Sequence, residues 1–166
     1  MERKLIKYYY NFLNNSFLYD QFYNSSLDTV STSKYLSSYR LNDSSIVILN
    51  IYDTSGREKF RQFNESFYGT ANFIILIYDI TDRESFNSCK NYFSENIKIL
   101  CKKQINILLL GNKNDLINKR EVSFEEAEKF AFDNNYYFME TSCLHKENVF
   151  KVFEKIVVWN KKGIKN

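Results

Sequence analysis

Several features that are common in protein chains are scarce or absent in this 166-residue sequence. It contains only three cysteines, and their spacing argues against a disulfide scaffold or a zinc site. The longest apolar runs, 73–78 and 105–110, are far shorter than the roughly 20 residues that a membrane-spanning helix needs. The first ten residues contain no long apolar stretch, so they do not resemble a signal peptide. These absences favour a reducing, cytoplasmic setting.

No charge of one sign dominates the chain either. The 23 Lys and Arg residues exceed the 20 Asp and Glu residues by three, and they are scattered, so nucleic acid is not an expected partner. Proline is absent, whereas Asn, Lys, Tyr and Ile are plentiful. This composition is typical of an AT-rich genome and makes chance motifs of Asn and Lys more frequent. The length suits one core, and no repeat or linker is visible, so we expect a single, monomeric domain over 1–166.

What is present is an alternation of strand-like and helix-like segments from residue 46 onward. Such alternation predicts the α/β class, with a doubly wound, mostly parallel sheet. A polar turn cluster at 42–45 predicts an antiparallel hairpin on its two sides. The predicted strands are 35–41, 46–52, 73–78, 105–110 and 136–139. The predicted helices are 3–19, 82–101, one that begins at the N-cap Ser123 with Glu126 as its capping-box partner, and 148–159, with a loop at 24–32.

Three polar motifs follow three of the predicted strands. In a doubly wound sheet, ligands bind at the carboxyl ends of the strands, and three motifs at equivalent places are stronger evidence than one. The motifs are Asp53-Thr54-Ser55-Gly56, Asn112-Lys113-Asn114-Asp115 and Glu140-Thr141-Ser142.

The first two motifs each have a chemical interpretation and a simpler alternative. Asp53 can face a metal ion while Gly56 lets a phosphate approach the backbone, but an ordinary Asp/Gly turn would look the same. The Asp115 carboxylate can accept both N–H donors on the edge of guanine, which adenine does not offer. The alternative for Asp115 is a solvated turn. The longer strings around these motifs favour the ligand-binding interpretation.

Those longer strings resemble the Rab-type small GTPases of the Ras superfamily. Residues 51–60 match the Rab string I-W-D-T-A-G-Q-E-R-F at six of ten positions. The segments 66–71 and 76–81 resemble the Rab strings S-Y-Y-R-G-A and L-V-Y-D-I-T, and 140–144 resembles E-T-S-A-K. The resemblance extends over roughly 11–160. It implies a regulator of vesicle traffic that uses GTP or GDP and Mg²⁺.

The resemblance also implies a set of site residues. Guanine would contact two loops, phosphate would contact Gly56, and Mg²⁺ would bind Thr29 directly and Asp53 through a water molecule. Arg57 stands where the family has the catalytic Gln that orients water. The residues expected to bind guanine are Asn112, Lys113, Asp115, Ser142, Cys143 and Leu144.

Several departures from the family pattern accompany this match. No G-x-x-x-x-G-K-[ST] phosphate loop occurs, and alignment puts Tyr10 on its Lys and Asn11 on its Ser/Thr. Because 3–19 has helical spacing, we expect the family's first central strand to be missing too, although Leu5–Tyr10 could form a substitute strand. Leu144 replaces a Lys. These departures predict a truncated domain with weak nucleotide binding and weak or absent GTP hydrolysis.

Two functions are therefore compatible with the sequence. The first is a Rab-like GTP/GDP switch whose segments 24–33 and 53–71 contact effectors and exchange factors. A full-length, lipidated relative would act on the cytosolic face of endomembranes, but no prenylation Cys is present here, so membrane contact would be indirect. The second is a nucleotide-independent pseudo-GTPase that serves as a protein-binding module.

Overall fold

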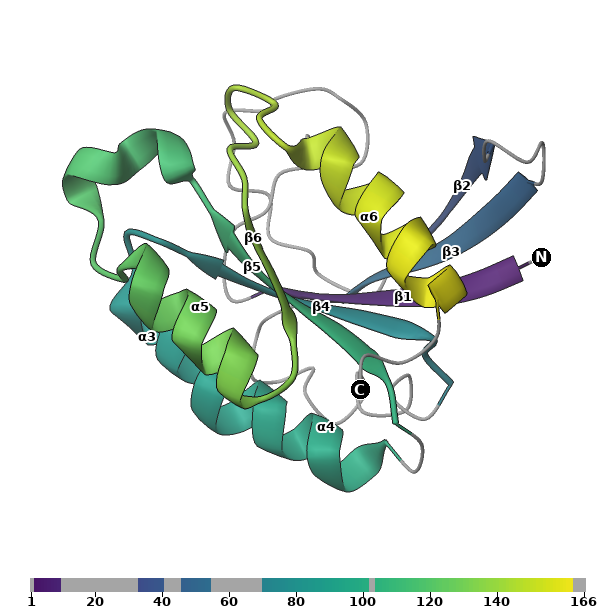
Figure 1. The fold of residues 1–166 in the computed structure, drawn as a ribbon, viewed down its shortest axis with the longest axis horizontal. Helices are drawn as coiled ribbons and strands as arrows, with labels where there is room; N and C mark the ends of the chain where they lie inside the picture. Colours follow the sequence, from purple (N-terminus) through teal and green to yellow (C-terminus); the bar gives the residue numbers. More distant parts are fainter. Residues whose placement is uncertain (1, 10–32, 41–45, 55–69, 102–103, 163–166) are drawn as a thin grey trace.

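The computed structural model describes residues 2–9, 33–40, 46–54, 70–101 and 104–162, and a six-stranded sheet lies at its centre (Figure 1). The strand order is β2-β3-β1-β4-β5-β6, and every pair is parallel except β2 with β3. This confirms the doubly wound, mostly parallel α/β class. The strands are β1 (Glu2–Tyr9), β2 (Ser33–Arg40), β3 (Ile46–Thr54), β4 (Phe73–Asp79), β5 (Asn106–Asn112) and β6 (Tyr137–Glu140).

The N-terminal segment corrects two of the expectations. Residues 2–9 form strand β1 and not the start of a helix, and this strand occupies the central place that the sequence left empty. Leu5 pairs with Ile51 of β3 on one side and with Phe73 of β4 on the other. The substitute strand was therefore the correct alternative. Residues 2–9 form a strand here because β3 and β4 each present a row of backbone N–H and C=O groups, and a parallel neighbour satisfies the hydrogen bonds of both rows.

The predicted antiparallel pairing is confirmed between β3 and β2, which is an edge strand of the sheet. Residues Ser33 to Arg40 pair with Asp53 to Ile46 along the whole length of β2. The rest of the predicted helix 3–19 and the predicted loop 24–32 lie outside the described residues, as does the turn at 42–45.

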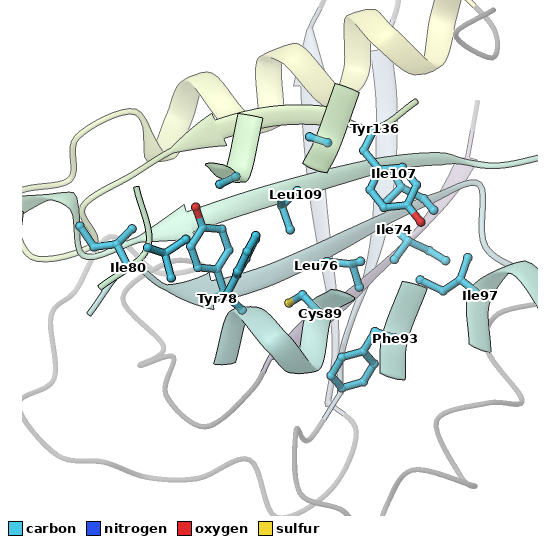
Figure 2. Close-up of a cluster of buried hydrophobic side chains, with 14 of the residues drawn as sticks. Ile74, Leu76, Tyr78, Ile80, Cys89, Phe93, Ile97, Ile107, Leu109 and Tyr136 are labelled. Atoms are coloured by element: carbon cyan, nitrogen blue, oxygen red, sulfur yellow. The ribbon is translucent and has the colours of Figure 1, made fainter. Parts of the chain in front are cut away.

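The two apolar strands β4 and β5 are buried on both faces, as continuous apolar runs predict. Successive side chains point to opposite faces, so one strand supplies two cores. Ile74, Leu76 and Tyr78 belong to one core, which Figure 2 shows in close-up. Phe73 and Ile75 belong to the other.

Helices cover both faces of the sheet (Figure 1). On one face lie α3 (Arg83–Ser88), a π-helical turn η2 (Cys89–Phe93), α4 (Ser94–Leu100) and α5 (Phe124–Asp133), which pack on the Tyr78 side. On the other lies α6 (Val149–Lys162), which buries Val152, Phe153 and Ile156 against the sheet. A short 3-10 segment, η3 (Asn114–Lys119), follows β5.

Capping residues fix where the helices on the Tyr78 side begin. The Asp82 carboxylate accepts hydrogen bonds from the backbone N–H groups of Glu84 and Ser85, which starts α3. Ser123 Oγ accepts from the N–H of Glu126, so Ser123 is the N-cap of α5 as predicted. The Glu126 side chain does not complete the predicted capping box. Its carboxylate instead accepts hydrogen bonds from the Arg83 guanidinium at 2.7 Å.

Candidate functional site

The candidate site lies at the carboxyl ends of β4, β5 and β6. Asp79 is the last residue of β4 and pairs in register with Asn112, the last residue of β5. Glu140 ends β6, and the loop 141–143 follows it directly. The parallel register therefore brings the polar motif after β5 and the polar motif after β6 side by side.

The buried Asn112 side chain fastens these two loops together. Its Oδ1 accepts hydrogen bonds from the N–H of Cys143 at 3.3 Å and from the hydroxyl of Thr141 at 3.4 Å. Two backbone bonds reinforce the contact: the N–H of Asn114 donates to Thr141 O, and the N–H of Thr141 donates to Gly111 O. Asn112 therefore holds the geometry of the site.

Asp115 and Ser142 form the second link between the loops. The Ser142 hydroxyl donates to Asp115 Oδ1 and accepts from the N–H of His145 at 3.1 Å. A carboxylate offers about four lone-pair positions, so the Ser142 bond orients Asp115 and leaves capacity for further donors. The half-buried Asp115 carboxylate is thus a hydrogen-bond acceptor whose orientation is fixed by its contact with the second loop.

Lys113 is held by a residue that the sequence did not single out. Its backbone lies in the left-handed region at φ 67°, and its ammonium group forms an ion pair with Asp79 Oδ2. The other Asp79 oxygen accepts from the N–H and hydroxyl of Thr81 at 2.8 and 2.7 Å. Asp79 therefore fixes both the end of β4 and the Lys113 side chain. Its position directly after an apolar run was the available signal.

The remaining predicted guanine residues have contrasting environments. Cys143 is buried, as a small residue in the Ala position would be, whereas the Leu144 residue that replaces Lys is 46% exposed. His145 is also exposed.

The predicted metal and phosphate residues lie mostly outside the described part of the chain. Thr29, Gly56 and Arg57 are not among the described residues. Asp53 is buried near the end of β3, and both β1 and β4 separate it from the Asn112 strand. Within the described residues, no group of three His, Cys, Asp or Glu side chains gathers as metal ligands. Asp53 thus keeps its predicted role in Mg²⁺ binding only as a proposal.

Comparison with known proteins assigns the chain to a family. The model of the Ras family matches residues 11–161. The chain belongs to the Ras family. Ras-related protein Rab-4A of Bos taurus is 45% identical over 107 residues, which are 64% of this chain and 49% of that protein. Rab-4 of Dictyostelium discoideum is 44% identical over 109 residues (66% and 53%), and RABD2a of Arabidopsis thaliana is 42% identical over 111 residues (67% and 54%).

The match to Rab-type members of the Ras family agrees with the resemblance found in the sequence. The aligned parts cover about half the length of these curated relatives. In the described part of this Ras-family chain, no helix has the length and apolar character needed to cross a membrane.

Gly111, just before the Asn112 loop, is predicted to resist substitution. A Cβ atom there would lie 2.8 Å from the Tyr78 hydroxyl oxygen and 3.1 Å from Glu140 Cγ. Gly111→Ala is therefore expected to lower the free energy of unfolding by about 1–3 kcal/mol, measured by urea denaturation. Adding Tyr78→Phe removes the nearest atom and should recover part of the loss. Equal losses in the single and double variants would contradict this packing explanation.

Proposed function

We propose that this Ras-family chain is a Rab-like guanine-nucleotide-binding protein that acts as a GTP/GDP switch in vesicle traffic. The observation that carries the proposal is the joining of the two loops by Asn112 and by the Ser142–Asp115 hydrogen bond. This arrangement supports the proposal because it orients a carboxylate, and a carboxylate is the group that a base edge with two N–H donors requires. The Rab names of the relatives support the cellular role.

In this proposal each of the two loops has its own task. Asp115 reads the guanine edge, because a carboxylate that faced adenine would lose the two donors that compensate its burial. Asp79 keeps Lys113 extended along the first loop, and Asn112 keeps the second loop against it. Ser142, Cys143 and Leu144 complete the base pocket. Bound guanine nucleotide supplies the phosphate that distinguishes the two states of the switch.

The phosphate side of the site is proposed to be weak in the 166-residue chain. The sequence has no G-x-x-x-x-G-K-[ST] motif, so the N–H cradle and the Lys charge for phosphate are missing from it. Thr29 and Asp53 would hold Mg²⁺, and Gly56 would face the terminal phosphate. Arg57 at the Gln position should make hydrolysis slow, because Arg does not orient water as Gln does.

Switch partners follow from the same proposal. Segments 24–33 and 53–71 would change order with the nucleotide and contact effectors and exchange factors. A lipidated, full-length relative would present them on the cytosolic face of endomembranes.

Calorimetry on the purified 166-residue chain tests the proposal. We expect GDP to bind with a dissociation constant weaker than about 1 μM, which corresponds to roughly −8 kcal/mol, and ADP to bind at least about tenfold more weakly than GDP. Equal affinity for GDP and ADP would contradict guanine recognition by Asp115. Micromolar or tighter GDP binding would contradict the weak phosphate side. No GDP binding at millimolar concentration would overturn the switch and favour a nucleotide-independent protein-binding module.

A further inference from the structure

Three neighbouring residues of the sheet lie next to the loops 112–115 and 141–143, called the base loops below. Tyr78, Gly111 and Glu140 are direct neighbours in the register of β4, β5 and β6. Each precedes a residue of the site by one position: Asp79, Asn112 and Thr141, respectively. The Tyr78 ring and the Glu140 side chain both lie against Gly111, which has no side chain to hold them apart.

Tyr78 is only 1% exposed, so its hydroxyl lies inside the protein. Figure 2 shows the Tyr78 side chain within the cluster of buried side chains. Burial raises the pKa of the Tyr78 phenol well above its usual value, and the nearby Glu140 carboxylate raises it further. The Tyr78 phenol therefore stays neutral, and because a phenol is never positively charged, it does not balance the charge of Glu140. That charge must be balanced from elsewhere.

Arg120 provides that balance. Its guanidinium donates two parallel hydrogen bonds to the Glu140 carboxylate, at 2.7 and 2.8 Å, and a third to Val122 O at 3.0 Å. The side chains of Arg120 and Glu140 are only 17% and 9% exposed. The hydrogen bond to Glu140 raises the pKa of Arg120 further. Paired, planar contacts of this kind fix orientation as well as supplying energy.

The pair joins the end of the segment that contains Asp115 to the start of the 141–143 loop. Arg120 directly follows η3, the segment that contains Asp115, and its N–H donates to Ile117 O. Glu140 directly precedes Thr141, and its backbone oxygen accepts from the Asn148 side chain at 3.1 Å. Asn112 thus joins the start of the first loop to Thr141 and Cys143. Arg120 joins the end of the segment that contains Asp115 to Glu140, which precedes the second loop.

We propose that Arg120 is a positioning residue for base recognition, and that its bidentate contact with Glu140 sets the spacing between Asp115 and the 141–143 loop. This proposal rests on the proposed function for its consequence in nucleotide binding. Its structural part, the coupling of the two loops, holds with or without nucleotide.

The geometry predicts what loss of the guanidinium does. Without it, the buried Glu140 carboxylate draws in water or turns outward, and either change moves the start of the 141–143 loop. The bonds from Cys143 to Asn112 and from Asn114 to Thr141 then open more often. A merely stabilising ion pair would instead raise opening throughout the domain when it is lost.

Amide hydrogen exchange on the nucleotide-free 166-residue chain separates these possibilities. In Arg120→Ala we expect exchange at Asn114, Thr141 and Cys143 to accelerate about tenfold or more, while helix α6 keeps its wild-type rates. Arg120→Lys keeps the charge but loses the planar pair, so an intermediate acceleration is expected, and this milder variant serves if Arg120→Ala fails to fold. The matched control is Glu126→Ala, which breaks the 2.7 Å Arg83–Glu126 pair, whose side chains are 37% and 38% exposed, and leaves the contact between Arg83 and Glu121 O in place.

The control should leave exchange in both base loops at wild-type rates. Unchanged loop exchange in the Arg120 variants, or an equal acceleration across the whole chain, would overturn the proposal. Calorimetry with GDP gives the second readout: Arg120→Ala should weaken binding about tenfold, and Glu126→Ala should not weaken it. If the wild-type chain binds no GDP while the loops still loosen in Arg120→Ala, the proposed function fails and the positioning of the loops by Arg120 stands.

Discussion

Asp115→Asn is expected to reverse the base preference of the chain, from guanine toward xanthine nucleotides. In the proposed site, guanine would present two N–H donors to the Asp115 carboxylate, whereas xanthine would present one donor and one carbonyl oxygen. An Asn side chain offers one acceptor and one N–H donor, which matches xanthine. Because mismatched polar groups in a site cost large factors, the ratio of the GDP to the XDP dissociation constant should rise about a hundredfold or more.

This change is measured as the two dissociation constants of each variant by competition titration. The substituted side chain keeps one oxygen to which Ser142 can still donate, so the loop contact that orients this side chain is retained in the variant. The matched control is Asp133→Asn, which alters an exposed carboxylate that pairs with Lys129 on helix α5. The control should keep the wild-type ratio. An unchanged ratio in Asp115→Asn would show that Asp115 does not read the base.

Much of the fold could be predicted from the sequence because the patterns of strands β4 and β5 are unambiguous. The run 73–78 is continuous and apolar, 105–110 is apolar except for Asn106, and both are too short for helices. Both form strands within one or two residues of the predicted bounds. The base loops could be predicted for the same reason, since a polar motif that follows such a strand must lie at the edge of the sheet. Asn112 and Asp115 lie where that argument puts them.

The first strand could not be predicted from local pattern alone. Leu5 and Tyr9 have helical spacing, but the same stretch is rich in Leu, Ile and Tyr, which suit a strand equally well. The choice depends on β3 and β4, whose adjacent edges need a parallel neighbour. Those edges are more than 35 residues away in sequence, so tertiary pairing overrides the local signal.

The supporting residues of the site escaped prediction for a related reason. Asp79 lies in the segment 76–81, which resembles a Rab string, but its contact with Lys113 joins positions 34 residues apart. Arg120 lies outside every motif, and its partner Glu140 is 20 residues away. Motifs identify residues that face a ligand. Residues that hold those motifs in place become visible only when the register of the sheet is known.

Phe86→Ala is expected to cause the largest loss of stability among the variants considered. Phe86 is fully buried, and its ring lies 5.0 Å from the ring of Tyr78 and 5.8 Å from that of Phe130. It therefore joins α3, β4 and α5 at one point. Truncation removes these contacts and leaves a cavity, which typically costs about 3–5 kcal/mol. That is a large share of the roughly 5–15 kcal/mol that stabilises a domain.

Urea denaturation, monitored by fluorescence of the single Trp159, measures this loss. The control is Phe132→Ala, the same substitution on α5 at a side chain that is 79% exposed, and it should change the free energy of unfolding by less than about 0.5 kcal/mol. Similar losses in the two variants would contradict the packing described here. Because Phe86 supports the Tyr78 ring that lies against Gly111, the loops at 112–115 and 141–143 should also exchange their amide hydrogens faster in Phe86→Ala. Faster exchange in these loops would show that the core on this face of the sheet also holds the loops at 112–115 and 141–143 in position.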